Sequence, residues 1–396
     1  YRRQRQMCIR DRKQLIIITL IFLVGQVKAS GQTYYTEATN RDMLHQANRT
    51  GASTRVEFIL PDSIGGYIPL KADLHLHTYF SDGHLSPSAR VREAWLDGLD
   101  AISVTDHIEY HPADTDMIGY LGATLPDGIE AHNVNKKPNV KPKQDLNKSV
   151  ELSKKAAVSY GLLIIPGTEI TREPKGIGHY NALFTTDNNG IYDPNPLTAI
   201  RNAKAQGALV MHNHPGWRRE SIQHPDFELK AYGEGLIDGI ETNNGTAFCP
   251  GTIDRAKEDS LFVASTTDLH NTSFEEYIGR GLRRDMTIIL AKDRSLDAIR
   301  DALENRRTIG YGAGGTLMGQ EYLLRQLFMS CVSISPVNGH NIQLKNPTSL
   351  RFIIHPDGKN PIVLPEFSSI ILSDKDRRFS VDNAWTGADS FLRISL

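Results

Sequence analysis

Short apolar runs alternate along the middle of the chain with segments whose apolar residues lie three and four positions apart. The apolar runs predict buried strands of a parallel sheet, and they cover 99–104, 162–165, 180–184, 208–211, 236–241 and 262–267. The second pattern predicts helices over 88–98, 149–160 and 197–206. Repeated units of this kind predict an α/β fold whose parallel sheet is either open or closed into a barrel.

The pattern changes on both sides of this region. Residues 30–54 are polar and are interpreted as an N-terminal leader, after which the run 55–60 predicts a strand that ends at a Pro-Asp-Ser-Ile-Gly-Gly turn. Beyond residue 315 the sequence predicts a helix and then a small, sandwich-like all-β appendage, with the helix at 320–331 and strand-like runs at 349–354, 362–364, 369–372 and 391–396. The predicted division is therefore an α/β unit over 55–315 and a helix with a β domain over 316–396. Packing on the α/β unit is the default role of the appendage, while assembly and glycan binding stay open.

Residues 1–29 have the features of a secretory signal peptide behind a short non-native leader. A basic segment at 10–13 precedes the apolar run 15–24, and Val27-Lys28-Ala29 supplies the residues of a signal peptidase site. The apolar run is too short to span a bilayer, which takes roughly 20 residues. We therefore expect a mature chain that starts near Ser30, is periplasmic or secreted, and has no membrane anchor.

The charge of the expected mature chain limits its partners. The first 29 residues hold seven Lys or Arg and one Asp, so that removing this +6 from a net charge of −1 leaves about −7. Proteins that bind nucleic acid gain affinity by neutralising phosphates, and this balance therefore predicts no stable nucleic-acid binding. Two cysteines remain, Cys249 and Cys331; their pairing stays open, as does the oligomeric state.

Residues that can bind metal ions follow the predicted strands where each strand ends. His75 and His77 alternate with Leu74 and Leu76, so that both imidazoles lie on one face of a strand, and Asp82 follows in a Ser-Asp-Gly turn. A lone pair of this kind fits a half-buried strand with polar residues outside. Here, however, the other strand ends carry similar residues: Asp106 and His107, Glu169, His212 and His214, and Asp268 and His270. Because the carboxyl ends of parallel strands meet at one edge, the sequence predicts a metal site there, and its imidazoles and carboxylates suit Zn, Mn or Fe.

As a set, DLHLHTYFSDG, TDH, PGTEI, a following single His, HP and TDLH resemble the polymerase and histidinol phosphatase (PHP) superfamily of metallophosphoesterases. The resemblance covers roughly 55–310 and implies a distorted (β/α)7 barrel with two or three divalent metal ions. Two longer stretches, LPDSIGGYIPLKADLHLHT and AISVTDHIEYHP, are similar to exported bacterial phosphodiesterases that act on organophosphate diesters.

The resemblance also implies a role for each predicted ligand. His75, His77 and Asp268 would bind the first metal, and Glu169 would bridge it to a second metal that His179 and His214 complete. Asp82, His107 and His270 would hold the third. Many relatives carry a histidine where this chain has Asp82, so the occupancy of the third site stays open. His212 is the alternative to His214, or else faces the substrate.

The expected chemistry is hydrolysis of a small phosphate-ester substrate, since two metals about 3.5–4 Å apart can share a hydroxide nucleophile and clamp the phosphoryl oxygens. Glu169, Asp268, His270 and Arg172 are the predicted catalytic residues, with Arg172 pairing with a phosphate oxygen or else solvated. Asp73 and Asp106 are expected to orient a ligand imidazole, and Glu241 to be a structural hydrogen-bond partner. Aromatic residues near the ligands, Tyr79, Phe80, Tyr110 and Trp217, favour phosphate diesters as substrates.

Four alternatives stay open. Two are close in chemistry: a phosphomonoesterase of the histidinol-phosphate type and a nucleotide or oligonucleotide phosphoesterase. A metal-dependent amidohydrolase would use a similar barrel. A metal- or glycan-binding envelope protein without activity would keep the fold but not the whole ligand set.

Overall fold

A computed structural model describes residues 54–112, 145–170, 177–217, 219, 222, 226–245 and 247–396. Residues Thr54–Leu396 form one compact unit. The predicted signal peptide and nearly all of the polar leader lie outside the described residues. Within the described part of the chain, no helix combines the length and the apolar character that crossing a membrane requires.

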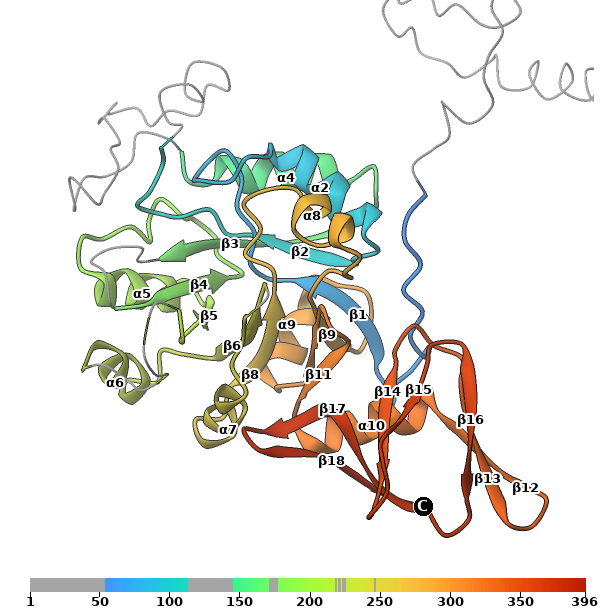
Figure 1. Cartoon of the computed structure of the whole chain (residues 1–396). Coiled ribbons are helices and arrows are strands. Elements are labelled where there is room, and N and C mark those ends of the chain that lie inside the picture. Colours follow the sequence, from blue (N-terminus) through green and yellow to red (C-terminus); the bar gives the residue numbers. More distant parts are fainter. Residues whose placement is uncertain are drawn as a thin grey trace, which may run out of the picture. The chain divides into compact units, whose positions relative to one another are not determined.

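The strands that carry the predicted ligands belong to one mixed sheet (Figure 1). In spatial order they are β9 (Met286–Ala291), β1 (Ile68–Asp73), β2 (Ala101–Val104), β3 (Leu163–Ile170), β4 (His179–Leu183), β5 (Leu209–Asn213), β6 (Gly239–Asn244) and β8 (Phe262–Thr266). β1, β2 and β3 run parallel, as do β5, β6 and β8. β4 is antiparallel to both β3 and β5, and β9 is antiparallel to β1. The prediction of an α/β fold with a parallel-rich sheet is confirmed.

The sheet curves until β8 lies beside β9. No ladder joins these two strands, and side chains hold the seam instead: Thr287 Oγ1 accepts a hydrogen bond from Ser265 N at 3.0 Å and donates one to Ser265 O at 2.9 Å. The side chains of both strands are buried. This near-closure brings the ends of the first and last parallel strands together at one edge.

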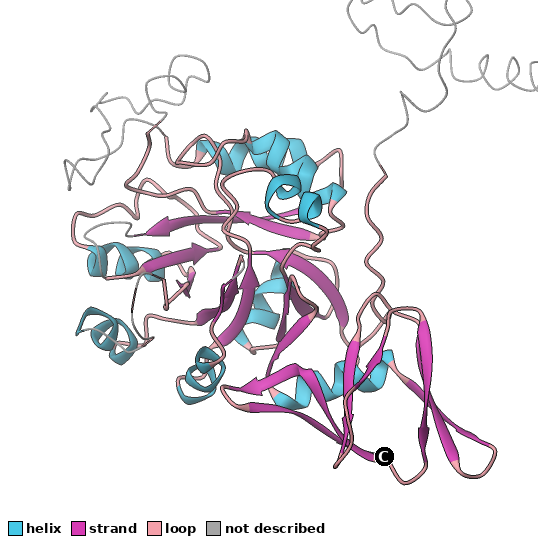
Figure 2. Cartoon of the chain, in the orientation of Figure 1, coloured by secondary structure: helices cyan, strands magenta, loops and turns pink. Residues whose placement is uncertain are grey.

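Helices cover the outer face of this sheet, as Figure 2 shows. They are α2 (Pro87–Leu96), α4 (Lys148–Ala157), α5 (Pro196–Ala205), α6 (Asp226–Gly233), α7 (Gly251–Glu258), α8 (Ser273–Glu276) with the 3-10 turn Ile278–Arg280, and α9 (Leu296–Glu304). α2 shows why these segments are helical: the Ser86 side chain accepts from Ala89 N as an N-cap and Pro87 occupies the first turn. Its apolar stripe, Val91 and Ala94, is fully buried, and burying a side chain such as Val contributes roughly 1.5–3 kcal/mol.

The C-terminal region is all-β apart from α10 (Glu321–Cys331) and continues the same sheet. β10 (Thr308–Gly312) pairs with β9, and the sheet then runs through β11 (Thr316–Gly319), β17 (Arg378–Gly387), β14 (Phe352–Pro356) and β15 (Ile362–Leu364), with β18 (Ser390–Ser395) beside β17. A separate three-stranded sheet contains β12 (Ser333–Val337), β13 (Asn341–Asn346) and β16 (Ser368–Ser373). The all-β appendage is confirmed. The division at 315/316 stays a prediction, because the sheet crosses that point.

The strand predicted over 55–60 is wrong. These residues are extended but make single contacts instead of a ladder: Val56 N donates to Leu96 O at 2.7 Å, and Ile59 O accepts from Ser349 N at 2.8 Å. Phe58 is buried, whereas Val56 is 49% and Ile59 43% exposed. The apolar alternation therefore reflects one anchoring side chain and not a strand face.

Candidate metal centre

All nine predicted metal ligands meet at one edge of the sheet: His75, His77, Asp82, His107, Glu169, His179, His214, Asp268 and His270. They come from the carboxyl ends of five parallel strands and from the amino end of β4. Because β4 runs antiparallel, its first residue lies at the edge where its neighbours end. Arg172 lies outside the described residues, and its predicted role stays a prediction.

The ligand atoms form four overlapping groups, in each of which they lie within 4.8 Å of one another. The groups are His77, Asp82, His107 and His270; His75, His214 and Asp268; His75, His77 and Glu169; and Glu169, His179 and His214. The second and third ligand sets predicted from the sequence each fall within one group, whereas the first is divided, because Asp268 is grouped with His75 and His214 and not with His77. His77 also belongs to the group around Asp82, so that it lies between two possible ion positions.

Glu169 is the centre of the cluster and is completely buried. Its oxygens lie 2.8 Å from His107 Nδ1, 3.0 Å from His179 Nδ1 and 3.4 Å from Nε2 of both His75 and His77. Burial would raise the pKa of Glu169, but His107 and His75 outweigh it and hold that pKa well below its usual range. A buried, ionised carboxylate with imidazoles around it can bridge two cations.

His75, His77 and Asp268 form a second close contact. Asp268 Oδ1 lies 2.9 Å from His77 Nε2 and 3.2 Å from His75 Nε2, and the two Nε2 atoms are 3.1 Å apart. Burial and the charges of His270 and His107 lower the pKa of His77 to about 4, so this imidazole is neutral at neutral pH. Two imidazole nitrogens aimed at one point beside a carboxylate fit a cation, since neutral imidazole and carboxylate are the forms that bind metals.

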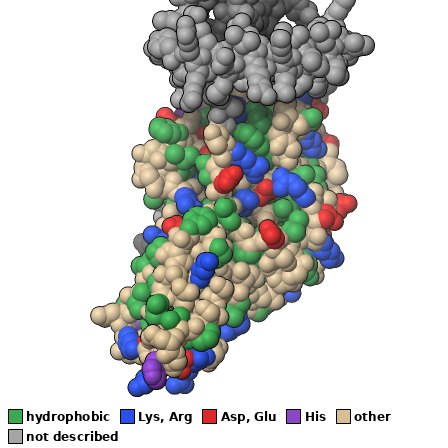
Figure 3. Space-filling model, turned by 90° about the vertical axis from the view of Figure 1, so that its right-hand side faces the viewer, with side chains coloured by type: hydrophobic (Ala, Val, Ile, Leu, Met, Phe, Trp, Pro, Cys, Tyr) green, Lys and Arg blue, Asp and Glu red, His purple; other side chains and the backbone are tan. Residues whose placement is uncertain are grey.

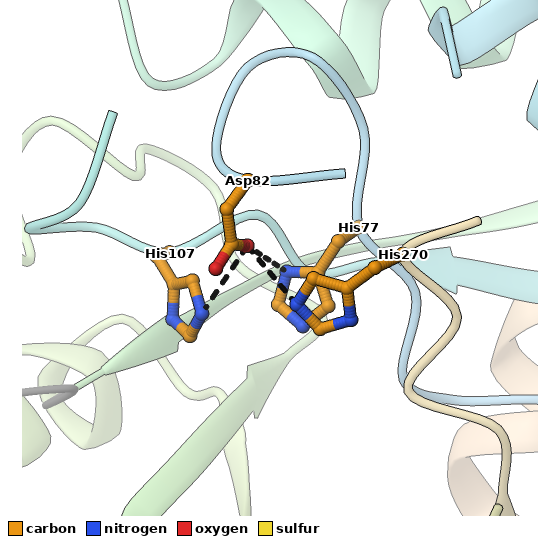
Figure 4. A group of neighbouring side chains, drawn as sticks. All are labelled: His77, Asp82, His107 and His270. Atoms are coloured by element: carbon orange, nitrogen blue, oxygen red, sulfur yellow. Dashed lines mark ion pairs between the residues drawn. The ribbon is translucent and has the colours of Figure 1, made fainter. Parts of the chain in front are cut away.

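Figure 4 shows the group around Asp82, in which His270 is the most exposed member, with 33% of its side chain open to solvent. Asp82 Oδ1 is 3.1 Å from His270 Nε2, 3.5 Å from His107 Nε2 and 3.8 Å from His77 Nδ1. Burial would lower the pKa of His270, but the hydrogen bond to Asp82 and the charge of Asp268 outweigh it and raise the pKa to about 9. Asp82 therefore accepts from a protonated His270 when no cation is bound.

A left-handed backbone decides which histidine after β5 joins the cluster. His214 has a φ of 27°, which turns its side chain until Nε2 is 3.8 Å from Glu169 Oε1. His212 is fully buried elsewhere, stacked on Tyr180 and with Nδ1 3.0 Å from Tyr232 OH. The alternative in which His212 is a ligand or faces the substrate does not fit this geometry.

Asp268 has the same feature, with a φ of 53° directly after β8. Such a conformation is unfavourable for residues with a side chain, and it is often kept at functional sites. It aims the Asp268 carboxylate at the two Nε2 atoms of His75 and His77.

A carboxylate that contacts a ligand imidazole is Glu241, in the middle of β6. Its Oε1 lies 2.6 Å from His75 Nδ1, and its Oε2 accepts from His214 N at 2.7 Å. The sequence predicted only a structural hydrogen-bond partner here. Glu241 ends the strand predicted over 236–241, as the other ligands end or follow theirs. This position could have identified its role from the sequence.

The expectation that Asp73 and Asp106 orient a ligand imidazole is wrong for Asp73. Asp106 does so through Ser81, whose Oγ donates to Asp106 Oδ1 at 2.7 Å and lies 3.2 Å from His77 Nδ1. Asp106 accepts from Thr78 N and Oγ1, both at 2.7 Å. Asp73 accepts from the backbone of His75 at 3.3 Å and from the Arg284 guanidinium at 2.9 Å. Both carboxylates therefore fix the loops that carry the ligands, and neither touches a ligand ring directly.

Aromatic side chains flank two of the ligand groups. The Trp217 ring centroid lies 5.4 Å from those of both His179 and His214, and Trp217 is 50% exposed. The Tyr110 ring lies 6.2 Å from that of His107. Phe80, expected near the ligands, is only 3% exposed and belongs to the core. Trp217 and Tyr110 are thus the aromatic groups that contact the predicted ligands.

Comparison with known proteins identifies the kind of centre that this is. A model of the PHP domain family matches residues 73–278, just over half of the chain. A two-domain protein of known structure from Bacteroides vulgatus, described as containing a predicted PHP-like metal-dependent phosphoesterase, is 32% identical with a TM-score of 0.76. That match covers 87% of this chain and 99% of the other. Among curated proteins, none matches this chain.

More distant structures share only parts of the chain. Endonuclease Q from Pyrococcus furiosus is 16% identical with a TM-score of 0.39, and the match covers 64% of this chain and 59% of that one. An amidohydrolase from Chromobacterium violaceum is 14% identical with a TM-score of 0.35, over 52% of this chain and 89% of that one. Similarities this low carry no argument about activity.

Proposed function

This chain belongs to the PHP domain family and is a metal-dependent phosphoesterase of that type, and on this premise we propose that it hydrolyses phosphate diesters. The observation that carries the proposal is the buried Glu169 carboxylate, which lies within 3.4 Å of nitrogens from four histidines. A single carboxylate in that position can serve two cations at once.

We assign three cation positions to the cluster. The first takes His75, His77, Glu169 and Asp268; the second takes Glu169, His179 and His214; the third takes Asp82, His107 and His270, with His77 at its edge. Imidazole and carboxylate donors without thiolates suit Zn, Mn or Fe. Cations held there would supply Lewis acidity toward a phosphoryl oxygen and a water of lowered pKa.

The residues of the chain have defined tasks around this chemistry. Glu241 keeps His75 in one tautomer, because its Oε1 accepts from Nδ1 and leaves Nε2 free to bind. His270 is the most exposed of the assigned histidines, with a third of its side chain open to solvent, which places it where a substrate oxygen can approach. Trp217, half exposed beside His179 and His214, offers an apolar surface to an ester substituent.

Two features favour a diester over a monoester. A diester carries one negative charge where a monoester carries up to two, and an expected mature charge near −7 disfavours the approach of the more negative ester. A diester also has a second substituent, for which Trp217 and Tyr110 provide contact area. On the face shown in Figure 3, basic and acidic side chains are interspersed.

The test is kcat/KM for bis-p-nitrophenyl phosphate against p-nitrophenyl phosphate, with Mn and Zn supplied separately. We expect the diester to be preferred with at least one metal, and Asp268→Asn, purified in parallel, to remove both activities. A tenfold preference for the monoester with both metals, about 1.4 kcal/mol of transition-state stabilisation, would favour the phosphomonoesterase alternative instead.

A further inference from the structure

Two loops that carry ligands are far apart in the sequence but meet at the edge of the sheet where the ligands lie. One follows β1 and carries His75 and His77; the other follows β8 and carries Asp268 and His270. Their backbones are joined directly: Asp268 N donates to His75 O at 3.0 Å, and His77 N donates to Leu269 O at 3.1 Å. The distance between ligands from the two loops therefore depends on what holds this junction in place.

Arg90, on α2, lies at this junction and is completely buried. It donates to four backbone carbonyls, one on the first loop and three on the second: His77 O (3.2 Å), Leu269 O (3.2 Å), His270 O (3.3 Å) and Asn271 O (2.9 Å). Its fifth hydrogen bond goes to Glu93 Oε2 at 2.6 Å. Every N–H of the guanidinium is thus used, since arginine has five.

Glu93 extends the contact to the helix that follows the second loop. Its second oxygen, Oε1, accepts from Ser273 N, the first residue of α8, at 2.5 Å. Arg90 and Glu93 lie one turn apart on α2, so both side chains reach the loops from one helix face. α2 is itself fixed by its buried stripe of Val91 and Ala94, which makes it a rigid support.

We propose that Arg90, supported by Glu93, is a positioning residue of the metal centre: it holds the loop of His75 and His77 against the loop of Asp268 and His270 and thereby sets the first and third cation positions. The inference rests on the proposed function, because it presupposes that the cluster binds cations. The planar guanidinium of arginine has five donors, enough for four carbonyls and the Glu93 carboxylate. A lysine at this position would keep the positive charge but offer only three donors, which do not lie in one plane.

The geometry makes the effect selective. The third position, with His77, Asp82, His107 and His270, takes three of its four ligands from the two loops that Arg90 joins. The first position, with His75, His77, Glu169 and Asp268, also takes three of four from these loops, whereas the second, with Glu169, His179 and His214, takes none. A variant that loosens the contacts of Arg90 should therefore weaken the first and third cation positions and leave the second close to its original affinity.

The experiment compares Arg90→Lys and Glu93→Gln with a matched control, Arg307→Lys. Arg307 is also a buried arginine that donates to a backbone carbonyl, Leu290 O at 3.1 Å, but it precedes β10 at the sheet edge away from the ligands. Each full-length protein is titrated with Mn or Zn in competition with a chelator, and bound metal is counted by elemental analysis. For Arg90→Lys we expect two cations per chain to bind ten- to a hundredfold more weakly, as for other residues that orient ligands, while the cation at the second position is unaffected; for Arg307→Lys we expect no change.

His270→Ala separates the third position from the first. Because it removes a ligand of the third position, the double variant Arg90→Lys/His270→Ala should lose no more affinity at that position than His270→Ala alone, which is the signature of residues acting on one site. Glu93→Gln should act in the same direction as Arg90→Lys, with a smaller effect, and it decides the question if Arg90→Lys does not fold.

Three results would overturn the inference. The first is an Arg90→Lys protein that is less thermostable but binds all cations as the wild type does, which would mean that the Arg90 contacts only stabilise the fold. Glu93→Gln is read in the same way if Arg90→Lys does not fold. Equal weakening of every cation would mean a general disturbance, and additive losses in the double variant would mean independent effects. A wild-type chain that binds no cation would refute the proposed function itself.

Discussion

Replacing Glu169 by glutamine should remove two cations at once. The variant keeps the size of the side chain and the acceptor for Asn213 Nδ2, which donates to Glu169 Oε1 at 2.9 Å. It removes the negative charge that the surrounding imidazoles hold ionised, with the pKa of Glu169 well below its usual range despite burial. If Glu169 bridges the first and second positions, both lose a charged ligand.

The size of the effect follows from the burial of the site. Unit charges about 4 Å apart attract each other by about 4 kcal/mol at an effective dielectric constant near 20. A divalent cation bound directly by the carboxylate is closer than this and carries twice the charge. The loss of the Glu169 charge should therefore cost at least about 4 kcal/mol of binding free energy at each cation position. Since about 1.4 kcal/mol is a factor of ten in affinity, each cation should bind at least about a thousandfold more weakly.

Asp106→Asn is the matched control. Asp106 is a buried carboxylate that follows β2, the strand next to β3, but its side chain accepts only from Thr78 and Ser81 and touches no ligand ring. Changes to such outer partners typically cost about 10–100-fold in metal affinity or activity. The assay is chelator competition with elemental analysis, read beside turnover of the diester substrate. Losses of equal size in Glu169→Gln and Asp106→Asn would refute the bridging role.

Three further predictions concern Glu241, His270 and export. Glu241→Gln should weaken metal binding about 10–100-fold, because Glu241 holds His75 Nδ1 and His214 N; chelator competition measures this, and unchanged affinity would remove Glu241 from the site. The melting temperature of metal-free protein should fall between pH 6.5 and 9, because the pKa of His270 is raised to about 9 in the fold, against burial, by Asp82 and Asp268. A raised pKa contributes stability that is complete below the unfolded value near 6.5 and is lost as pH rises through the folded value; Asp82→Asn should flatten this slope, and a flat wild-type profile would contradict the argument. For export, N-terminal sequencing of native protein should find a start near Ser30, whereas an intact segment 15–24 in a soluble cytoplasmic fraction would rule it out.

The elements that the sequence predicted well are those whose pattern is local. Helices α2, α4 and α5 begin and end within a few residues of their predicted bounds, because caps and apolar spacing are encoded within the segment itself. β9 was missed although its run of six residues, MTIILA, is apolar apart from one threonine and is wholly buried. That signal was available. The strand predicted at 55–60 failed for the opposite reason, because its pattern was local but its partners, Leu96 and Ser349, are distant.

The ligands were predictable because they follow strands whose ends must meet, and this needs only the order of elements. The orientation of His214 was not, because φ of 27° at a histidine has no glycine or other local signal in the sequence. The positions of Asp73 and Asp106 were not predictable either. An acid next to a ligand in the sequence can bind a ring, a hydroxyl or a backbone N–H, and only the folded loops decide among them.

The direction of β4 shows how the distortion of the barrel serves the metal centre. In a regular βα repeat the fourth strand would run parallel to β3, and its first residue would lie at the far edge of the sheet. The first and last of the five residues of β4 are four steps of about 3.3 Å apart, so His179 would then lie about 13 Å away from the ligands. Because β4 instead turns back against β3, with Glu169 opposite Asn181, His179 Nδ1 comes to 3.0 Å from Glu169 Oε1. The second cation position therefore depends on one antiparallel strand, which neither the apolar pattern nor the ligand spacing reveals.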